Sequence, residues 1–248
     1  MTSNQFSIRL HEARKMMGLS MEKLAELTGG IITKQSISRY EKGLMLPKRV
    51  AKLAMAKALN ISDSYFDGTN ISIDVPMLRT TSNGKLSEDE LQALEAKLSF
   101  WAEQYLAKEK EAGFPTQFNN PIEGTKISTL EDAIHAADLL REKWHCGDGP
   151  IASILRLLER KGIMILAATL PDYVFGMSTW ADKKHPLMIL DINPEKSPVE
   201  KLRFTAVHEL AHLLISFPQE SDYSVDKRCD LFASFFLLPK LALIEELG

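Results

Sequence analysis

The first 67 residues alternate short stretches of periodic apolar positions with turn residues, a pattern typical of a small helical bundle. Within each stretch the apolar residues recur at intervals of three and four, and Gly, Ser or Pro stands between stretches. The tight turns predict a compact five-helix domain over residues 1–67. Its helices are expected at residues 6–17, 21–27, 34–41, 47–59 and 62–66.

Residues 68–128 are predicted to connect two domains. A polar stretch comes first, with an apolar alternation at residues 71–75 that favours one strand or an extended segment. Ser87 and Glu90 then form a capping box for a long helix at residues 88–111, whose large apolar positions share one stripe. Because such a stripe must be covered, either by the rest of the chain or by a second copy, this helix is a candidate homodimer contact.

Residues 129–248 combine helical and strand patterns in a second domain. Turn residues separate three apolar segments, so we expect a small antiparallel sheet. The fold class is therefore mainly α with a small antiparallel sheet (α+β). The strands are expected at residues 163–168, 174–181 and 187–191, and the helices at 129–144, 151–161, 198–217 and 225–238.

The helix expected at residues 198–217 contains the pentad His208-Glu209-Leu210-Ala211-His212, an HExxH motif in an apolar run. Residues four apart on a helix lie one above the other, so His208 and His212 can direct both imidazoles at one point. Two imidazoles, a third protein ligand and a water suit Zn²⁺, and Glu209 can accept the proton of that water. The alternative is two histidines that pack in the core or at the surface without a metal.

The next helix offers the third ligand. Asp226 and Asp230 lie four residues apart and share a face, so one can bind the ion while the other orients a ligating histidine. A different interpretation of Asp226 is a carboxylate that favours the helix macrodipole near an N-terminus. For stabilising an oxyanion, Tyr173, His185 and Tyr223 are all candidates, and the sequence does not choose among them.

Composition limits the number of domains, the cellular compartment and the state of the cysteines. The chain has 248 residues, 45% of them hydrophobic and 25% charged, which suits two globular domains. Charges throughout residues 1–20 and the lack of a long apolar run predict a cytoplasmic protein without a membrane partner. The two cysteines, Cys146 and Cys229, are expected to be reduced thiols, and Cys229 lies close to the predicted metal.

Charge is unevenly distributed between the two ends of the chain. Residues 1–67 hold eleven Lys and Arg against six Asp and Glu, a charge of +5, which leaves −8 for the rest of a chain whose overall charge is −3. A basic module joined to an acidic body favours nucleic acid as the partner of the first module. A charged, solvated surface without a partner would have the same composition.

The helix expected at residues 34–41 points to the same partner. Its outward positions carry side chains that can contact base edges and phosphates in a major groove, namely Lys34, Gln35, Ser38 and Arg39. The string from Gln35 to Gly43, after Leu24-Ala25-Glu26-Leu27-Thr28-Gly29, resembles the helix-turn-helix domain of the Cro and lambda-repressor (XRE) type. The resemblance implies binding to double-stranded operator DNA. The turn at residues 29–32 is one or two residues longer than is usual there.

The second domain resembles the ImmA/IrrE-type metallopeptidases. The shared strings begin at Gly149-Pro150-Ile151 and Leu157-Leu158-Glu159, continue at residues 204–214, and end at residues 233–239. The resemblance implies a zincin-like domain with Zn²⁺ held by His208, His212 and Asp226. Members typically have Glu at the third position, and Asp222 and Asp230 are substitutes for the shorter Asp226. The chain ends soon after Pro239, as expected of a shortened or divergent member.

The two resemblances together imply a DNA-binding regulator with zinc-dependent endopeptidase activity. Its expected substrate is a repressor or an antitoxin, as in toxin-antitoxin regulation. The alternative is a transcription regulator that cleaves nothing and whose second domain senses or binds a partner, which Asp at the third-ligand position favours. A further possibility is an aminopeptidase-like or other zinc hydrolase.

Overall fold

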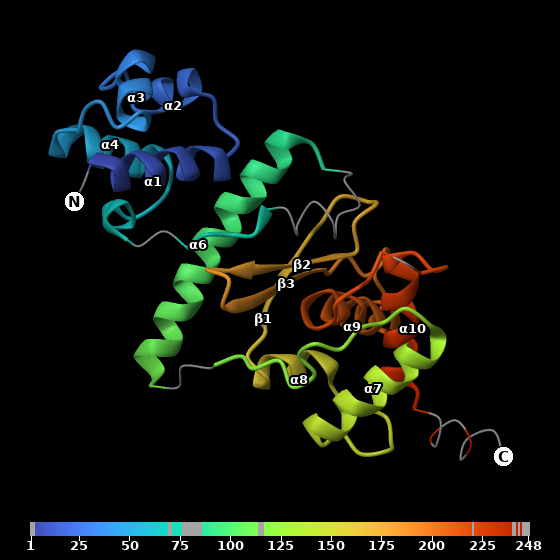
Figure 1. Cartoon of the computed structure of the whole chain (residues 1–248). Helices are drawn as coiled ribbons and strands as arrows, with labels where there is room; N and C mark the ends of the chain where they lie inside the picture. The colour runs from blue at the N-terminus through green and yellow to red at the C-terminus, as the bar shows by residue number, and fades with distance from the viewer. Residues whose placement is uncertain are drawn as a thin grey trace. The chain divides into compact units, whose positions relative to one another are not determined.

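The computed structural model describes residues 3–68, 71–75, 86–113, 117–219, 221–239, 242 and 244 (Figure 1). The chain forms two compact units, residues 1–73 with 86–113 and residues 74–85 with 114–248. Each unit has a hydrophobic core of its own. Among the helices of the described residues, none has the length and apolar character needed to cross a membrane.

The first unit is entirely helical. Ser20 and Thr33 cap its second and third helices by accepting the backbone N–H of Lys23 and Ser36. The five helices predicted for residues 1–67 are confirmed, with ends shifted by at most three residues. The elements of the unit are α1 (Ser3–Met16), α2 (Met21–Leu27), α3 (Lys34–Glu41), α4 (Arg49–Ala58), η1 (Asp63–Asp67) and α6 (Glu88–Ala112).

The long helix α6 belongs to the first unit, although the sequence placed it in a connecting segment. The fully buried Arg9 of α1 joins it to the core, because its Nη2 lies 2.5 Å from Glu103 Oε2 of α6. The same guanidinium donates to the carbonyl of Tyr65 at 2.9 Å and stacks 3.8 Å above the Tyr65 ring. Phe100 of α6 packs on that ring from a centroid distance of 5.4 Å. Of the apolar positions predicted to share one stripe of α6, Leu91 and Leu98 are buried, with 2% and 0% of each residue exposed.

For residues 71–75 of the connection, the sequence predicted one strand or an extended segment. The structure has no named strand there, and Ile73 occupies an isolated bridge position. Asp74, which belongs to the second unit, instead donates its backbone N–H to Trp180 O at 3.0 Å and accepts from Thr179 Oγ1 at 2.8 Å. The rest of the predicted linker, residues 76–85, lies outside the described residues.

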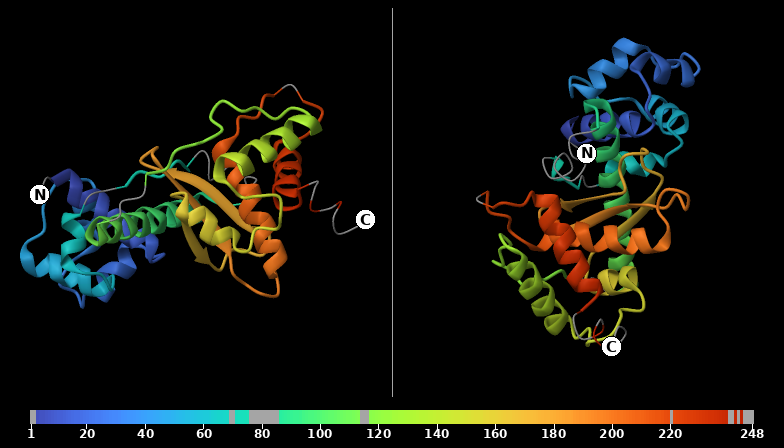
Figure 2. Two further views of the ribbon diagram at one scale, coloured as in Figure 1. Left: turned by 90° about the horizontal axis from the view of Figure 1, so that it is seen from below. Right: turned by 90° about the vertical axis from the view of Figure 1, so that its right-hand side faces the viewer.

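The second unit stacks a small sheet, one central helix and two outer helices. Figure 2 shows α9 between the strands and α10, with α7 on the outer side of α10. Helix α9 is central because its buried apolar side chains cover a wide part of its circumference, among them Val207, Ala211 and Leu213. The elements are α7 (Leu130–Trp144), α8 (Ile154–Arg160), β1 (Met164–Ala168), β2 (Gly176–Ala181), β3 (His185–Asp191), α9 (Val199–Leu214) and α10 (Val225–Leu237).

The sheet is mixed, and its strand order is β1-β3-β2. Strands β2 and β3 form the antiparallel hairpin that the turn residues predicted, with Asp182 and Lys183 at φ of 50° and 55° in the turn. Strand β1 pairs with β3 in parallel, so the prediction of an antiparallel sheet is wrong for this pair. The physical reason is the length of the connection between β1 and β2, residues 169–175. It is long enough to cross the position beside β1, and β3 then occupies that position.

Candidate functional site

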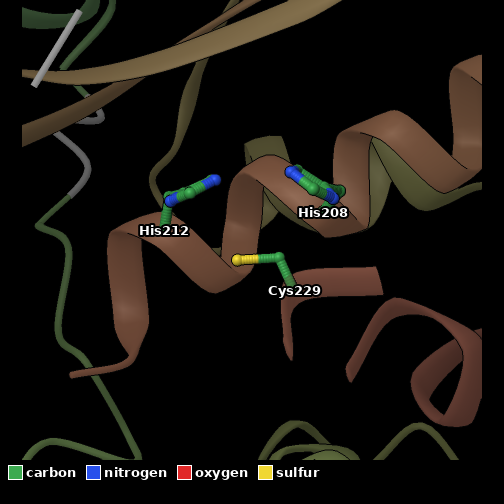
Figure 3. A group of neighbouring side chains, drawn as sticks. All are labelled: His208, His212 and Cys229. Carbon is green, nitrogen blue, oxygen red and sulfur yellow. The ribbon is translucent and has the colours of Figure 1, made fainter. Parts of the chain in front are cut away.

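Helix α9 brings His208 and His212 together in the second unit. Their ring centroids are 5.1 Å apart, as the spacing of four residues predicts. The thiol of Cys229 reaches the same place from α10, as Figure 3 shows. One ligand atom from each of these three residues lies within 4.8 Å of the other two, and within the described part of the chain this is the group that could hold a metal ion.

Asp230 lies where it can orient His208. Its Oδ1 is 2.9 Å from His208 Nδ1, across the contact between α10 and α9. A carboxylate at this distance favours the tautomer with the proton on Nδ1, which leaves Nε2 as the free electron-pair donor. Asp230 therefore has the geometry of the orienting role that its spacing from Asp226 indicated.

Asp226 is adjacent to the histidine pair but outside the compact group. Its Oδ1 is 3.9 Å from His212 Nε2, and 48% of its side chain is exposed. Its possible substitute Asp222 is exposed. Cys229 is fully buried instead, three residues further along the same face of α10. That spacing was visible in the sequence, yet Cys229 was interpreted only as an ordinary thiol near the metal.

Glu209 is buried beside the pair, with 3% of the residue exposed. The Ser178 hydroxyl, on β2, donates to Glu209 Oε2 at 2.8 Å. Burial raises the pKa of Glu209 to about 8, and the Asp226 carboxylate acts in the same direction, while the Ser178 hydrogen bond opposes both. A carboxyl group with such a pKa can take up and release a proton near neutral pH.

Two further groups are held in uncharged forms. The pKa of His212 is lowered to about 4, mainly by burial and in smaller part by the neighbouring His208. Its imidazole is therefore neutral at pH 7. Neutral imidazole is the form that binds metal ions. Burial also raises the pKa of the Cys229 thiol far above its ordinary range, with the carboxylates of Glu209, Asp226 and Asp230 adding to the shift.

A cavity of about 260 Å³ opens beside His208 and Glu209. Tyr173 lines it, whereas His185 and Tyr223 are not among the described residues that do, so one of the three oxyanion candidates is brought to the site. Gly176 lines it as well, where β2 approaches α9. A Cβ on Gly176 would lie 2.6 Å from Thr205 Cγ2 and 3.2 Å from Glu209 Cγ, so this approach requires glycine.

Two charged groups, the buried Asp191 and the half-buried Lys196, anchor the loop that carries Tyr173. Lys196 donates to the carbonyls of Leu170 and Val174 at 3.2 and 2.7 Å. Asp191 accepts from the Leu170 N–H at 2.8 Å, and its pKa is lowered because this bond and the Lys196 charge outweigh the effect of burial. Neither residue was singled out in the sequence, because each acts on backbone groups some twenty residues away.

The first unit presents a different kind of site on α3. Lys34, Gln35 and Arg39 are exposed there and Ser38 is half-buried, while Ile37 and Tyr40 of the same helix are in the core. Lys34 forms an ion pair with Glu22 of α2 at the surface. The structure thus places the four predicted DNA-contacting residues on one helix, with three of them open to solvent.

Helix α3 is tied to α1 through a buried ion pair. Arg14 Nε and Nη2 donate to Glu41 Oε1 and Oε2 at 2.6 and 2.7 Å, and both side chains are 6% exposed. Burial raises the pKa of Glu41, but the hydrogen bonds from Arg14 and His11 prevail and lower it below its ordinary value. This bidentate pair fixes the C-terminal end of α3 against the core.

The long turn between α2 and α3 depends on two glycines. Gly29 and Gly30 have φ of 68° and 78°, a conformation that favours glycine. Ile32 then returns the chain to the core, with 4% of the residue exposed. The additional turn residues noted in the sequence are thereby accommodated before Thr33 caps α3.

Comparison with known proteins identifies the first unit. A family model described as helix-turn-helix matches residues 10–66, which run from α1 through η1. No match was found among curated proteins or among solved structures. The chain thus carries a DNA-binding domain of the helix-turn-helix class, and this supports a DNA-binding regulator. The family match does not extend into the second unit.

Proposed function

We propose that this DNA-binding regulator is also a zinc-dependent endopeptidase that cleaves a repressor or antitoxin protein. The observation that carries the proposal is the buried Glu209 beside the His208 and His212 pair, at the wall of a cavity. A buried carboxyl group whose pKa is raised to about 8, beside two imidazoles, is the kind of group that functional sites use for acid-base chemistry. The ImmA/IrrE resemblance of the surrounding motifs supports the same reaction class.

The donor set fits a zinc ion. His208 has its Nδ1 engaged by Asp230 at 2.9 Å, so its Nε2 would bind the ion, and the lowered pKa of His212 keeps its imidazole available. A third ligand would come from α10, where Asp226 and Cys229 both lie near the pair. Three protein ligands are the number that catalytic zinc sites use.

Zn²⁺ bound in such a site supplies a Lewis acid that brings the pKa of a water molecule toward neutrality. Glu209 would accept the proton of that water and later deliver it to the leaving amine. Ser178 holds the carboxylate in place during both transfers, since its hydroxyl donates to Oε2. Tyr173 at the cavity is the candidate donor to the oxyanion that forms on the scissile carbonyl.

The first unit would direct this activity to a particular promoter. With α3 in a major groove, the exposed Gln35 and Arg39 would contact base edges and Lys34 a phosphate. A homodimer would let two copies of α3 contact two half-sites of one operator. Cleavage of a repressor bound at the same operator would then couple the two units of the chain.

The test is metal analysis and cleavage with three variants. Wild-type protein should hold one zinc per chain, His208→Ala should hold none, and Glu209→Gln should keep zinc while losing cleavage of repressors encoded beside its gene. His135→Ala is the matched control, because His135 is exposed on α7. Wild-type protein without stoichiometric zinc would overturn the enzymatic proposal.

A second candidate function is a regulator whose second unit binds a partner without cleaving it. The position of Asp226 favours it, because a side chain one methylene shorter than Glu lies 3.9 Å from His212 Nε2 and is half exposed. The same samples separate the two functions. Zinc-loaded protein that leaves the repressors intact, while zinc changes its affinity for operator DNA, would support the non-catalytic regulator.

A further inference from the structure

We infer that Cys229 is the third protein ligand of the metal ion, so that the ion is held by His208, His212 and a thiolate. This inference rests on the proposed zinc chemistry of the second unit and names the ligand that α10 supplies. It also assigns Asp226 a place at the cavity wall instead of in the coordination sphere.

The distances favour the thiol. Its Sγ and one ring nitrogen from each histidine all lie within 4.8 Å of one another. Donor atoms around a tetrahedral zinc ion stand about 3.5 Å apart, given Zn–N near 2.0 Å and Zn–S near 2.3 Å. Side-chain movements on the order of 1 Å would therefore bring the three donor atoms to bonding distance from one ion, without a shift of α9 or α10.

Burial separates Cys229 from the two neighbouring carboxylates. Cys229 is completely buried, and its side chain extends from α10 toward the segment of α9 that carries both histidines (Figure 3). Asp226 and Asp230 have side chains that are 48% and 43% exposed, so both carboxylates keep contact with water. Asp230 is in addition engaged with His208 Nδ1. Of the three groups on this face of α10, the thiol is the one enclosed with the histidines.

Charge is consistent with this ligand set. The site contributes two imidazoles, which bind metal ions in their neutral form, and the thiol would lose its proton to solvent as the ion binds, so one negative charge offsets part of the 2+ charge. A soft thiolate beside two imidazoles favours zinc over calcium or magnesium. Three protein ligands leave a fourth position open, so the set is compatible with the role of Glu209 at the adjacent cavity.

Cobalt spectroscopy on the full chain tests the ligand directly. Co²⁺ bound to a thiolate gives an intense sulfur-to-metal charge-transfer absorption in the near ultraviolet, and Co²⁺ bound to nitrogen and oxygen donors does not. We expect this absorption in wild-type protein and in Cys146→Ser, where Cys229 is the remaining thiol. Cys229→Ser should lose the absorption and bind zinc at least about tenfold more weakly. Asp226→Asn should keep the absorption.

Each outcome decides the inference. Stoichiometric Co²⁺ in Cys146→Ser without the charge-transfer absorption would overturn the assignment of Cys229 and leave the zinc peptidase proposal intact. Failure of the wild-type protein to bind Co²⁺ or Zn²⁺ would overturn both. Because the absorption in Cys146→Ser is measured with the site residues unchanged, the result stands even where Cys229→Ser does not fold.

Discussion

The buried carboxyl groups Glu41 and Glu209, one in each unit, have opposite surroundings. Glu41 of the first unit is paired with the buried Arg14. Glu209 of the second unit accepts a hydroxyl donor from Ser178, and the charge that acts on its pKa is that of a second carboxylate, Asp226. A buried ion pair leaves neither charge without a counter-charge, whereas a buried carboxyl group without a cation is a feature that functional sites often share.

The candidate contacts also differ in where they lie. Those of the first unit are on the surface of the single helix α3, and those of the second come from β2, α9 and α10 and are largely enclosed. A surface on one helix can bind a partner without rearrangement. A site enclosed among three elements depends on how tightly they pack. The comparison therefore predicts that substitutions of the exposed residues of α3 alter binding alone, while substitutions around α9 alter both stability and the site.

The largest effect should come from the surface of α3. Gln35→Ala combined with Arg39→Ala should weaken binding to the DNA upstream of the protein's own gene by roughly thirtyfold to 10⁴-fold, since two base contacts are lost and each is worth about 1–3 kcal/mol. Binding is measured at moderate salt, with Gln104→Ala combined with Arg156→Ala as a control of equal charge change. Both control residues are exposed and lie outside α3. Unchanged DNA affinity of the Gln35→Ala and Arg39→Ala double variant would contradict a DNA-binding surface on α3.

A smaller effect is expected where the first unit holds its buried ion pair. Glu41→Gln should lower the free energy of unfolding of this unit by about 3 kcal/mol at pH 7, because Arg14 is left buried without its counter-charge. Amide hydrogen exchange in α1 and α3 measures the change. Glu26→Gln is the control, because its pair with Lys23 is exposed on both sides. Equal protection in the two variants would show that the buried pair contributes no more than a surface one.

Acid should remove the stabilisation that the Arg14–Glu41 ion pair contributes to the first unit. The pKa of Glu41 is lowered in the folded chain relative to its ordinary value of 4.5, so the unfolded chain takes up the proton first as the pH falls. The stabilisation is complete above the unfolded pKa and is lost as the pH falls through the folded one. The difference between wild type and Glu41→Gln should thus be constant between pH 6 and 7 and shrink below pH 4.5. A difference that persists unchanged in acid would exclude the Arg14 pair as its source.

The smallest effect should come from the approach of β2 to α9. Gly176→Ala should destabilise the second unit by about 1–3 kcal/mol, because the new methyl group would press on Thr205 and on the Glu209 stem. Hydrogen exchange in β2 and α9 measures it, and zinc affinity should fall in parallel. Gly149→Ala is the control, since a Cβ there meets nothing within 4 Å. A drop in stability with zinc affinity unchanged would show that the site tolerates looser packing than we infer.

The helices were predictable because their signals are local. Ser20, Thr33 and Ser87 each mark a helix start, and each accepts the backbone N–H that its position predicts. The β2 and β3 hairpin was predictable for the same reason. The pairing of β1 with β3 was not, because it joins residues about twenty positions apart and places β3 beside β1 in preference to the next strand, β2. The place of α6 in the first unit depends likewise on Arg9 and Glu103, which are ninety-four residues apart.

In the candidate site, too, the features within one helix were predictable and the contacts between elements were not. The pairing of His208 with His212 follows from the helical repeat, and the spacing of Asp226 and Asp230 from the same repeat on the next helix. The Ser178 hydroxyl on Glu209 and the Cys229 thiol at the histidines could not be predicted in this way. Both contacts depend on the distance and rotation between elements that meet only in the folded core.

By itself the sequence determined the helices, the residues exposed on α3, and the HExxH motif on an apolar helix. These properties depend on the residue period of a single element, which any isolated stretch of chain already contains. The tertiary structure alone decided the parallel pairing of β1, the environment that raises the pKa of Glu209, and the choice of group on α10 that faces the histidines. Those properties depend on distances between elements, and such distances exist only once the core has packed.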